Sequence, residues 1–205
     1  GVIPSFKIRT DTDELMDDFS ITDERLTTAL EQLRYVNRFL SGYSTSMAVL
    51  APFLRSRAQQ TTRILDLGTG IADFPEYIVQ WAAAQSPAIS VEIVAIDANP
   101  ITVDYARGAL KQRLPEQLQS KIRVEVADAL ALPYANQSFD LVMGAMFLHH
   151  FAQDNAIAII KSMQRISRCG ILINDLHRHP LAYLGIYALT HLLPASPMMR
   201  NDGPL

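Results

Sequence analysis

Short apolar runs alternate with amphipathic segments along most of the 205-residue chain. The apolar runs are rich in Ile, Val and Leu and predict buried strands at residues 63–67, 91–96, 122–126, 139–146 and 170–174. Apolar residues at helical spacing predict helices at residues 22–40, 46–57, 72–85, 99–114, 155–166 and 180–193. Strands that alternate with helices predict an α/β fold, in which a doubly wound, mostly parallel sheet is covered by helices on both faces.

The same pattern divides the chain into three segments. We expect residues 1–60 to form an N-terminal arm and helical cap, residues 61–180 the α/β domain, and residues 181–205 an apolar helix and tail. The last helix is apolar nearly all round and too short to span a bilayer, so it must be buried against something. We expect it to form a wall of a hydrophobic substrate pocket, with a partner subunit as the alternative.

Composition narrows the class of protein. The formal net charge is -3 and the basic residues are dispersed, which argues against nucleic acid as the partner. The single cysteine, Cys169, excludes an internal disulfide and a Cys-rich metal site, so we expect no metal and a reducing, cytoplasmic location. No apolar run is long enough for a membrane span, and the N-terminus has no signal-peptide pattern.

Acidic residues and glycines follow the first predicted strand, at the edge of a parallel sheet where ligands bind. In Asp66-Leu67-Gly68-Thr69-Gly70, the glycines allow a sharp turn and a close approach of the backbone to a ligand. A dinucleotide-binding fingerprint would place a third glycine at position 73. Asp73 stands there instead, a poor neighbour for a pyrophosphate but a tolerable one for a cation.

The next two strand ends also carry carboxylates. Asp97 follows the second strand and can accept hydrogen bonds from both ribose hydroxyls, as the acid of NAD-binding folds does. Asp128 follows the third strand, where its side chain can accept from an adenine amino group while a neighbouring backbone N–H reads a ring nitrogen. An ordinary turn residue is the alternative for Asp128.

These features together resemble a known family. Asp66-x-Gly68-x-Gly70, Asp97, Asp128-Ala129 and Phe139-Asp140-Leu141-Val142 resemble the successive motifs of class I S-adenosylmethionine (SAM)-dependent methyltransferases of the ubiquinone-biosynthesis-like group. The resemblance covers about residues 60 to 175, and Ala72 departs from it where many members have a third glycine.

The resemblance implies SAM as cofactor and S-adenosylhomocysteine (SAH) as product. It implies that Asp66 holds the amino group of SAM, that Asp97 takes the ribose and that Asp128 takes the adenine. The remaining implied cofactor residues lie beside these or after the fourth strand, and they are Gly68, Thr69, Gly70, Ala98, Ala129 and Ala145. We further expect Arg38, from the N-terminal helix that also brings Tyr43 near the site, to contact the SAM carboxylate.

A narrower similarity concerns the ends of the chain. Glu14-Leu15-Met16-Asp17, Val36-Asn37-Arg38 and Asn174-Asp175-Leu176 resemble a bacterial subgroup found with type III polyketide synthases. It implies a phenolic or polyketide-like acceptor of secondary metabolism. The fold of the wider family ends with two further strands, and the dozen residues after Leu193 are too few for them. We therefore expect those strands to be missing here, and the sheet edge to be covered by further chain or by a second copy in a homodimer.

Methyl transfer to a hydroxyl requires an aligned nucleophile, exclusion of water and removal of a proton. His149 and His150 follow the fourth strand and are candidate bases, with His150 favoured; merely ordering the loop is the alternative. Asp175, after the fifth strand, can orient such a base or form a loop salt bridge. An NAD(P)-dependent oxidoreductase and a non-catalytic scaffold are the competing functions. Asp73 disfavours the first, and the joint presence of the acidic strand ends disfavours the second.

Overall fold

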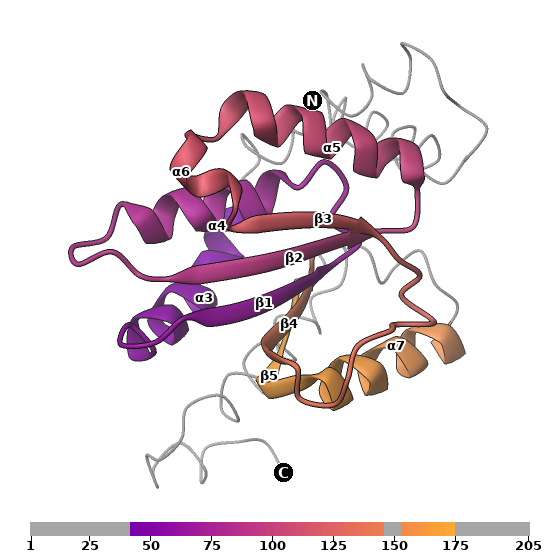
Figure 1. Cartoon of the computed structure of the whole chain (residues 1–205). Helices are drawn as coiled ribbons and strands as arrows, with labels where there is room; N and C mark the ends of the chain where they lie inside the picture. The colour runs from indigo at the N-terminus through magenta and orange to yellow at the C-terminus, as the bar shows by residue number, and fades with distance from the viewer. Residues whose placement is uncertain (1–41, 146–152, 175–205) are drawn as a thin grey trace, which may run out of the picture.

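The computed structural model of the chain describes residues 42–145 and 153–174 (Figure 1). Several predicted features lie outside these residues: the helices at 22–40 and 180–193, Arg38, Met146, His149, His150 and Asp175. No helix within the described ranges is both long and apolar enough to cross a membrane.

Five parallel strands form one sheet in the order β3-β2-β1-β4-β5. The strands are β1 (Thr62–Leu67), β2 (Val91–Asp97), β3 (Ile122–Val126), β4 (Phe139–Ala145) and β5 (Ser167–Asn174). The chain builds outward from β1 through β2 to β3, and then crosses back to place β4 and β5 on the other side of β1 (Figure 1). This reversal of strand order beside β1 is the point at which doubly wound sheets bind their ligands.

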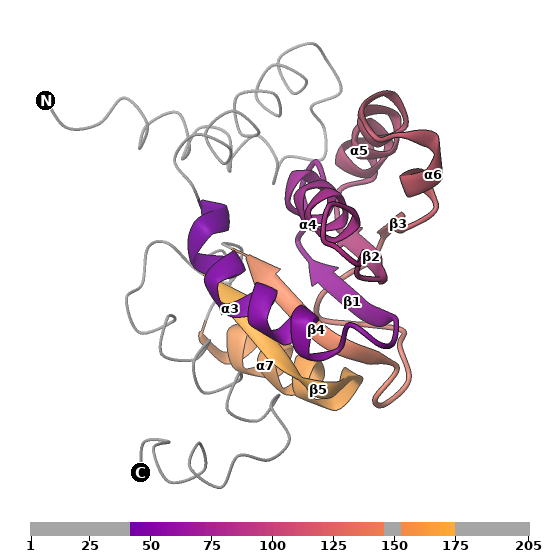
Figure 2. The same cartoon turned by 90° about the vertical axis from the view of Figure 1, so that its left-hand side faces the viewer.

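Helices cover both faces of this sheet (Figure 2). The helices are α3 (Gly42–Ser56), α4 (Asp73–Ala83), α5 (Pro100–Arg113), α6 (Glu116–Gln119) and α7 (Gln153–Ile166). Helices α3, α4 and α5 pack on one face, and α7 packs on the other. Residues 42–56, which we expected in the helical cap, thus pack on the sheet, while the division of the chain into three segments stays a prediction.

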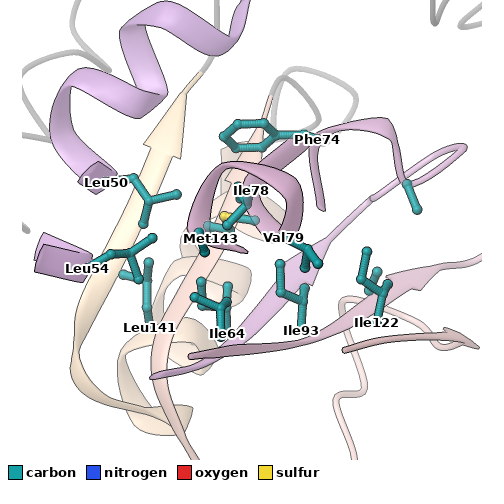
Figure 3. Packing of buried hydrophobic residues seen from close by; sticks show 14 of the residues in the cluster. Leu50, Leu54, Ile64, Phe74, Ile78, Val79, Ile93, Ile122, Leu141 and Met143 are labelled. Carbon is teal, nitrogen blue, oxygen red and sulfur yellow. The ribbon is translucent and has the colours of Figure 1, made fainter. Parts of the chain in front are cut away.

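The strand residues supply the two faces alternately. Ile64 points toward α3 and α4, together with Ile93 and Leu141, and Figure 3 shows these residues against Leu50, Leu54 and Ile78. The next residue, Leu65, belongs to the opposite cluster, which includes α7. The two-residue period of a strand requires this alternation. It also places Asp66 on the same face as Ile64, below α3 and α4.

The strands and helices lie close to their predicted positions, and the largest differences are at the starts of α3 and β5. Helix α3 begins at Gly42 rather than at Ser46. Strand β5 begins at Ser167 rather than Gly170, and α7 ends at the residue before it. The polar Ser167-Arg168 pair carries no strand pattern, yet Ser167 pairs with Phe139 across the register shift next to Leu141. The short helix α6 was not predicted, since four residues are too few for a periodic signal.

An ion cluster joins the amino-terminal ends of three strands, opposite the ligand edge. The carboxylate of Asp140 in β4 lies 3.1 Å from Arg57 and 2.9 Å from Arg168 of β5, and it accepts the backbone N–H of Arg63 in β1 at 2.8 Å. Asp140 and Arg57 are largely buried, whereas the Arg168 side chain is 56% exposed. The Asp140 of the Phe139-Asp140-Leu141-Val142 motif therefore ties the base of the sheet together.

Candidate cofactor site

The turn after β1 is made of alternate left-handed residues. Gly68 and Gly70 have φ of 64° and 59°, and Ala72 has φ of 58°. The Thr69 N–H donates to the carbonyl of Ile96 in β2 at 2.8 Å, which fixes the turn against the neighbouring strand. Ala72 has the same left-handed backbone conformation as these two glycines, although its side chain is fully buried.

Asp97, at the carboxyl end of β2, is held by this turn. Its Oδ2 accepts the backbone N–H of Gly70 at 3.0 Å, and its Oδ1 accepts the backbone N–H of Asn99 at 2.9 Å. A carboxylate oxygen can accept more than one hydrogen bond, so these two backbone contacts do not prevent the side chain from accepting hydroxyl groups as well. The side chain is half-buried. The carboxylate is therefore fixed in place before any ligand arrives.

Asp66 lies at the adjacent strand end and is only 3% exposed. Burial is the main reason that the pKa of its carboxyl is raised to about 7, and the charges of Asp73 and Asp97 make smaller contributions in the same direction. The Thr69 side chain lowers this pKa in part. Among the described residues the Thr69 hydroxyl has no partner in hydrogen-bond geometry. None of the groups that shift this pKa is a cation.

Asp73, the first residue of α4, is buried beside the turn and contacts α3. The Tyr43 hydroxyl donates a hydrogen bond to its carboxylate. The Tyr43 ring stacks on Phe74 with ring centroids 5.1 Å apart, and it contacts Tyr77 at the same separation. We expected Tyr43 near the site, but the sequence did not identify Asp73 as its partner, because 30 residues separate the two.

The residues predicted for an adenine lie at the end of β3. Asp128 is exposed, and its Oδ1 accepts the backbone N–H of Leu130 at 2.9 Å. Asp128 therefore stabilises the local turn, which was the alternative interpretation of this residue. Its carboxylate is also exposed and accessible to a ligand. Ala98 is exposed directly after Asp97, while Ala129 packs on the core cluster under α7. The N–H of Ala127 donates to the Asp97 carbonyl at 3.1 Å and joins this segment to β2.

The arrangement suits a nucleoside with a cationic substituent. Asp97 is a fixed, half-buried carboxylate that can accept the hydroxyls of a diol. The buried carboxyls of Asp66 and Asp73 lie near it, and the turn brings its backbone close to Asp97. The acidic corner disfavours a phosphate, because like charges there would repel. Ala145 is the last residue of β4 and is paired with Asn174 of β5, so it lies at the same carboxyl edge of the sheet as Asp66 and Asp97.

Comparison with known proteins identifies the class. The family model described as "Methyltransferase domain" matches residues 64–170, more than half of the chain, and the chain belongs to this family. The segment that carries the turn, Asp97 and Asp128 lies inside that match. The predicted class I SAM-dependent methyltransferase of the quinone-biosynthesis-like group, with SAM as cofactor, is thereby confirmed.

Individual relatives agree with this assignment. The chain is 26% identical over 166 residues to demethylmenaquinone methyltransferase of Roseiflexus sp. (strain RS-1), covering 74% of this chain and 63% of that protein. It is 27% identical over 131 residues to ajmaline N-methyltransferase of Rauvolfia serpentina, covering 62% of this chain and 41% of that protein. The chain therefore spans less than two thirds of the length of these relatives.

A solved structure supports the fold. The SAM-dependent methyltransferase of Aquifex aeolicus aligns with a TM-score of 0.54 at 18% identity, over 72% of this chain and 71% of that one. At this identity the likeness concerns architecture alone. It confirms the predicted Rossmann-like α/β class with a doubly wound sheet.

Proposed function

We propose that the protein transfers the methyl group of SAM to a small-molecule acceptor, and that the acceptor group is a hydroxyl of a phenolic or polyketide-like compound. One observation supports the use of SAM above all. The fixed Asp97 carboxylate lies next to the buried Asp66, where the strand order of the sheet reverses. SAM supplies a methyl group already activated by its sulfonium. The protein's task is then to bind, orient and exclude water.

The proposed roles follow the geometry strand by strand. Asp97 takes the ribose hydroxyls with its remaining acceptor capacity, and Asp66 faces the ammonium group. The turn residues Gly68, Thr69 and Gly70 surround the methionine part, whose carboxylate Arg38 contacts. Ala98, Asp128 and Ala129 take the adenine at the end of β3, and Ala145 lies on the sulfonium side at the end of β4.

The acceptor is proposed from the relatives and from the sequence. The relatives' names refer to a quinone precursor and to an alkaloid, which are both small molecules. The phenolic hydroxyl rests on the narrower sequence resemblance, and on the apolar segment 181–193 as a pocket wall. A homodimer, a cytoplasmic location and a place in secondary metabolism are parts of the same proposal.

His150, His149 and Asp175 are the proposed proton-handling residues. They follow β4 and β5 in the chain, whose carboxyl ends share the ligand edge of the sheet. His150→Ala and His149→Ala should lower turnover of a phenolic acceptor by roughly 100-fold or more for the true base, with little change in the Kd for SAH. Unchanged turnover in both variants would remove the histidines from the mechanism.

Calorimetric titration of the purified protein with SAM, SAH and NAD tests the function. Binding of SAM and SAH without binding of NAD is the expected result. Binding of NAD alone would instead support an oxidoreductase. Binding of none of the three would support a scaffold that has kept the fold without the cofactor.

A further inference from the structure

We propose that Asp66, Asp73 and Tyr43 form one proton-linked unit. A cationic ligand group placed beside the buried Asp66 displaces the proton of its carboxyl to solvent, and Asp73, positioned by Tyr43, raises the pH at which this occurs. The proposal rests on the proposed function, because the cation is the ammonium group of SAM or SAH. When the cofactor binds, the site exchanges the proton of Asp66 for the positive charge of the ligand.

The three nearest carboxylates differ in how they are compensated. Asp97 accepts two backbone N–H groups and is half-exposed to water, which stabilises its charged form. Asp73 accepts the hydroxyl of Tyr43. Asp66 is the most deeply buried of the three and forms no ion pair with a Lys, Arg or His within the described part of the chain. Its burial therefore favours the neutral form of the Asp66 carboxyl.

A second observation points to a ligand at the same place. Thr69 is 8% exposed and follows Asp66 closely in the turn, and its buried hydroxyl has no partner in hydrogen-bond geometry among the described residues. Buried polar groups are rarely left without a partner, so an unpaired hydroxyl beside a buried acid indicates that a polar group completes the site. An ammonium group can donate hydrogen bonds to the Asp66 carboxylate and to the oxygen of the Thr69 hydroxyl.

Tyr43 links the unit to α3. Its ring is fixed by stacking on Phe74, and its hydroxyl holds the Asp73 carboxylate at the start of α4. Asp73 and Asp97 are the charged groups that face Asp66 from α4 and β2. The paired neighbours of Asp66 are apolar: they are Ala95 in β2 and Met143 in β4. Burial keeps the proton on the Asp66 carboxyl, and repulsion from Asp73 adds to this effect until a cation arrives.

The test is calorimetric titration of the purified protein with SAH, between about pH 5.5 and pH 7.5, where the ligand's amine keeps its proton. Because the pKa of Asp66 is about 7, the affinity for SAH should rise roughly five- to tenfold between about pH 6 and pH 7.5. Titrations in buffers of different ionisation enthalpy should show about half a proton released per SAH near pH 7. 5′-Methylthioadenosine, which has no ammonium group, should bind without proton release.

Two variants separate this role from a structural one. Asp66→Asn mimics the neutral acid, so it should fold, bind SAH more weakly, and show neither proton release nor a pH dependence. Asp73→Asn keeps an acceptor for Tyr43 but removes a repelling charge, so its affinity rise should occur at lower pH. Asp104→Asn, at an exposed site on α5, should behave as the parent protein.

The outcomes distinguish the two proposals. If SAH binds with the same affinity at each pH and releases no proton, the proton-linked unit is wrong while the cofactor assignment stands. An unchanged pH profile in Asp73→Asn overturns the role of Asp73. If SAH does not bind at any pH, the proposed function fails, and the proton-linked unit fails with it.

Discussion

The backbone N–H of Gly70 donates a hydrogen bond to the carboxylate of Asp97 at 3.0 Å, so the turn after β1 and the end of β2 hold each other in place. Asp97 has its second fixed contact with the N–H of Asn99, whose own side chain caps α5 by accepting the N–H groups of Ile101 and Thr102. The carboxylate that we propose as the acceptor for the ribose is therefore built into the junction of two strands and a helix.

Asp97→Asn should lower the affinity for SAH by roughly 10- to 100-fold, because it removes a charged acceptor and turns one oxygen that accepts an N–H into a donor. Titration calorimetry measures the change. Asp104→Asn is the matched control, since it makes the same substitution at an exposed position of α5. Equal affinities in the two variants would show that Asp97 does not contact the ligand.

Asp140→Ala should destabilise the fold by about 3 kcal/mol or more, because it leaves the largely buried guanidinium of Arg57 without its counter-charge. Arg168→Ala removes a partner whose side chain is mostly exposed, so its cost should stay below about 1 kcal/mol. Urea denaturation of both variants measures the difference. Equal losses of stability in the two variants would mean that the burial of Arg57 and Asp140 does not determine how much each ion pair contributes.

Ala72→Val should lower the free energy of unfolding by about 2 to 3 kcal/mol, because a β-branched side chain is strained at φ of 58° and has no free space there. Ala72→Gly should change stability by less than about 1 kcal/mol, since the relief of strain offsets the loss of a buried methyl group. Ala83→Val, at an exposed position of α4, is the control for helix propensity. If the Ala72→Val variant were as stable as the parent protein, the left-handed backbone at position 72 would not strain a β-branched side chain.

The sequence predicted the strand ends well, because a local pattern determines them. An apolar strand followed by a glycine-rich turn places Asp66 at the ligand edge, and the same reasoning applies to Asp97. The two-residue period then decides which face Asp66 lies on. Neither step needs knowledge of distant segments, so both can be made from a few neighbouring residues.

The contacts made by α3 could not be predicted in this way. The bond from Tyr43 to Asp73 depends on how α3 packs beside α4, which no local pattern reports. The same is true of Asp140, which the sequence placed in a family motif. Its partners Arg57 and Arg168 come from α3's end and from β5, and only the folded sheet brings them together.

The raised pKa of Asp66 also predicts how the stability of the ligand-free protein depends on pH. The folded-state pKa is about 7 against an ordinary value of 3.8, so between these values the folded protein holds a proton that the unfolded chain has lost. The neutral acid's contribution is therefore complete below about pH 4 and is lost as the pH rises to about 7. Asp66→Asn has no such proton. It should gain stability relative to the parent by roughly 2 to 4 kcal/mol between about pH 4 and pH 7.5. Urea denaturation of both proteins across this range measures the gain, and parallel stability curves would show that Asp66 is ionised in the folded state throughout.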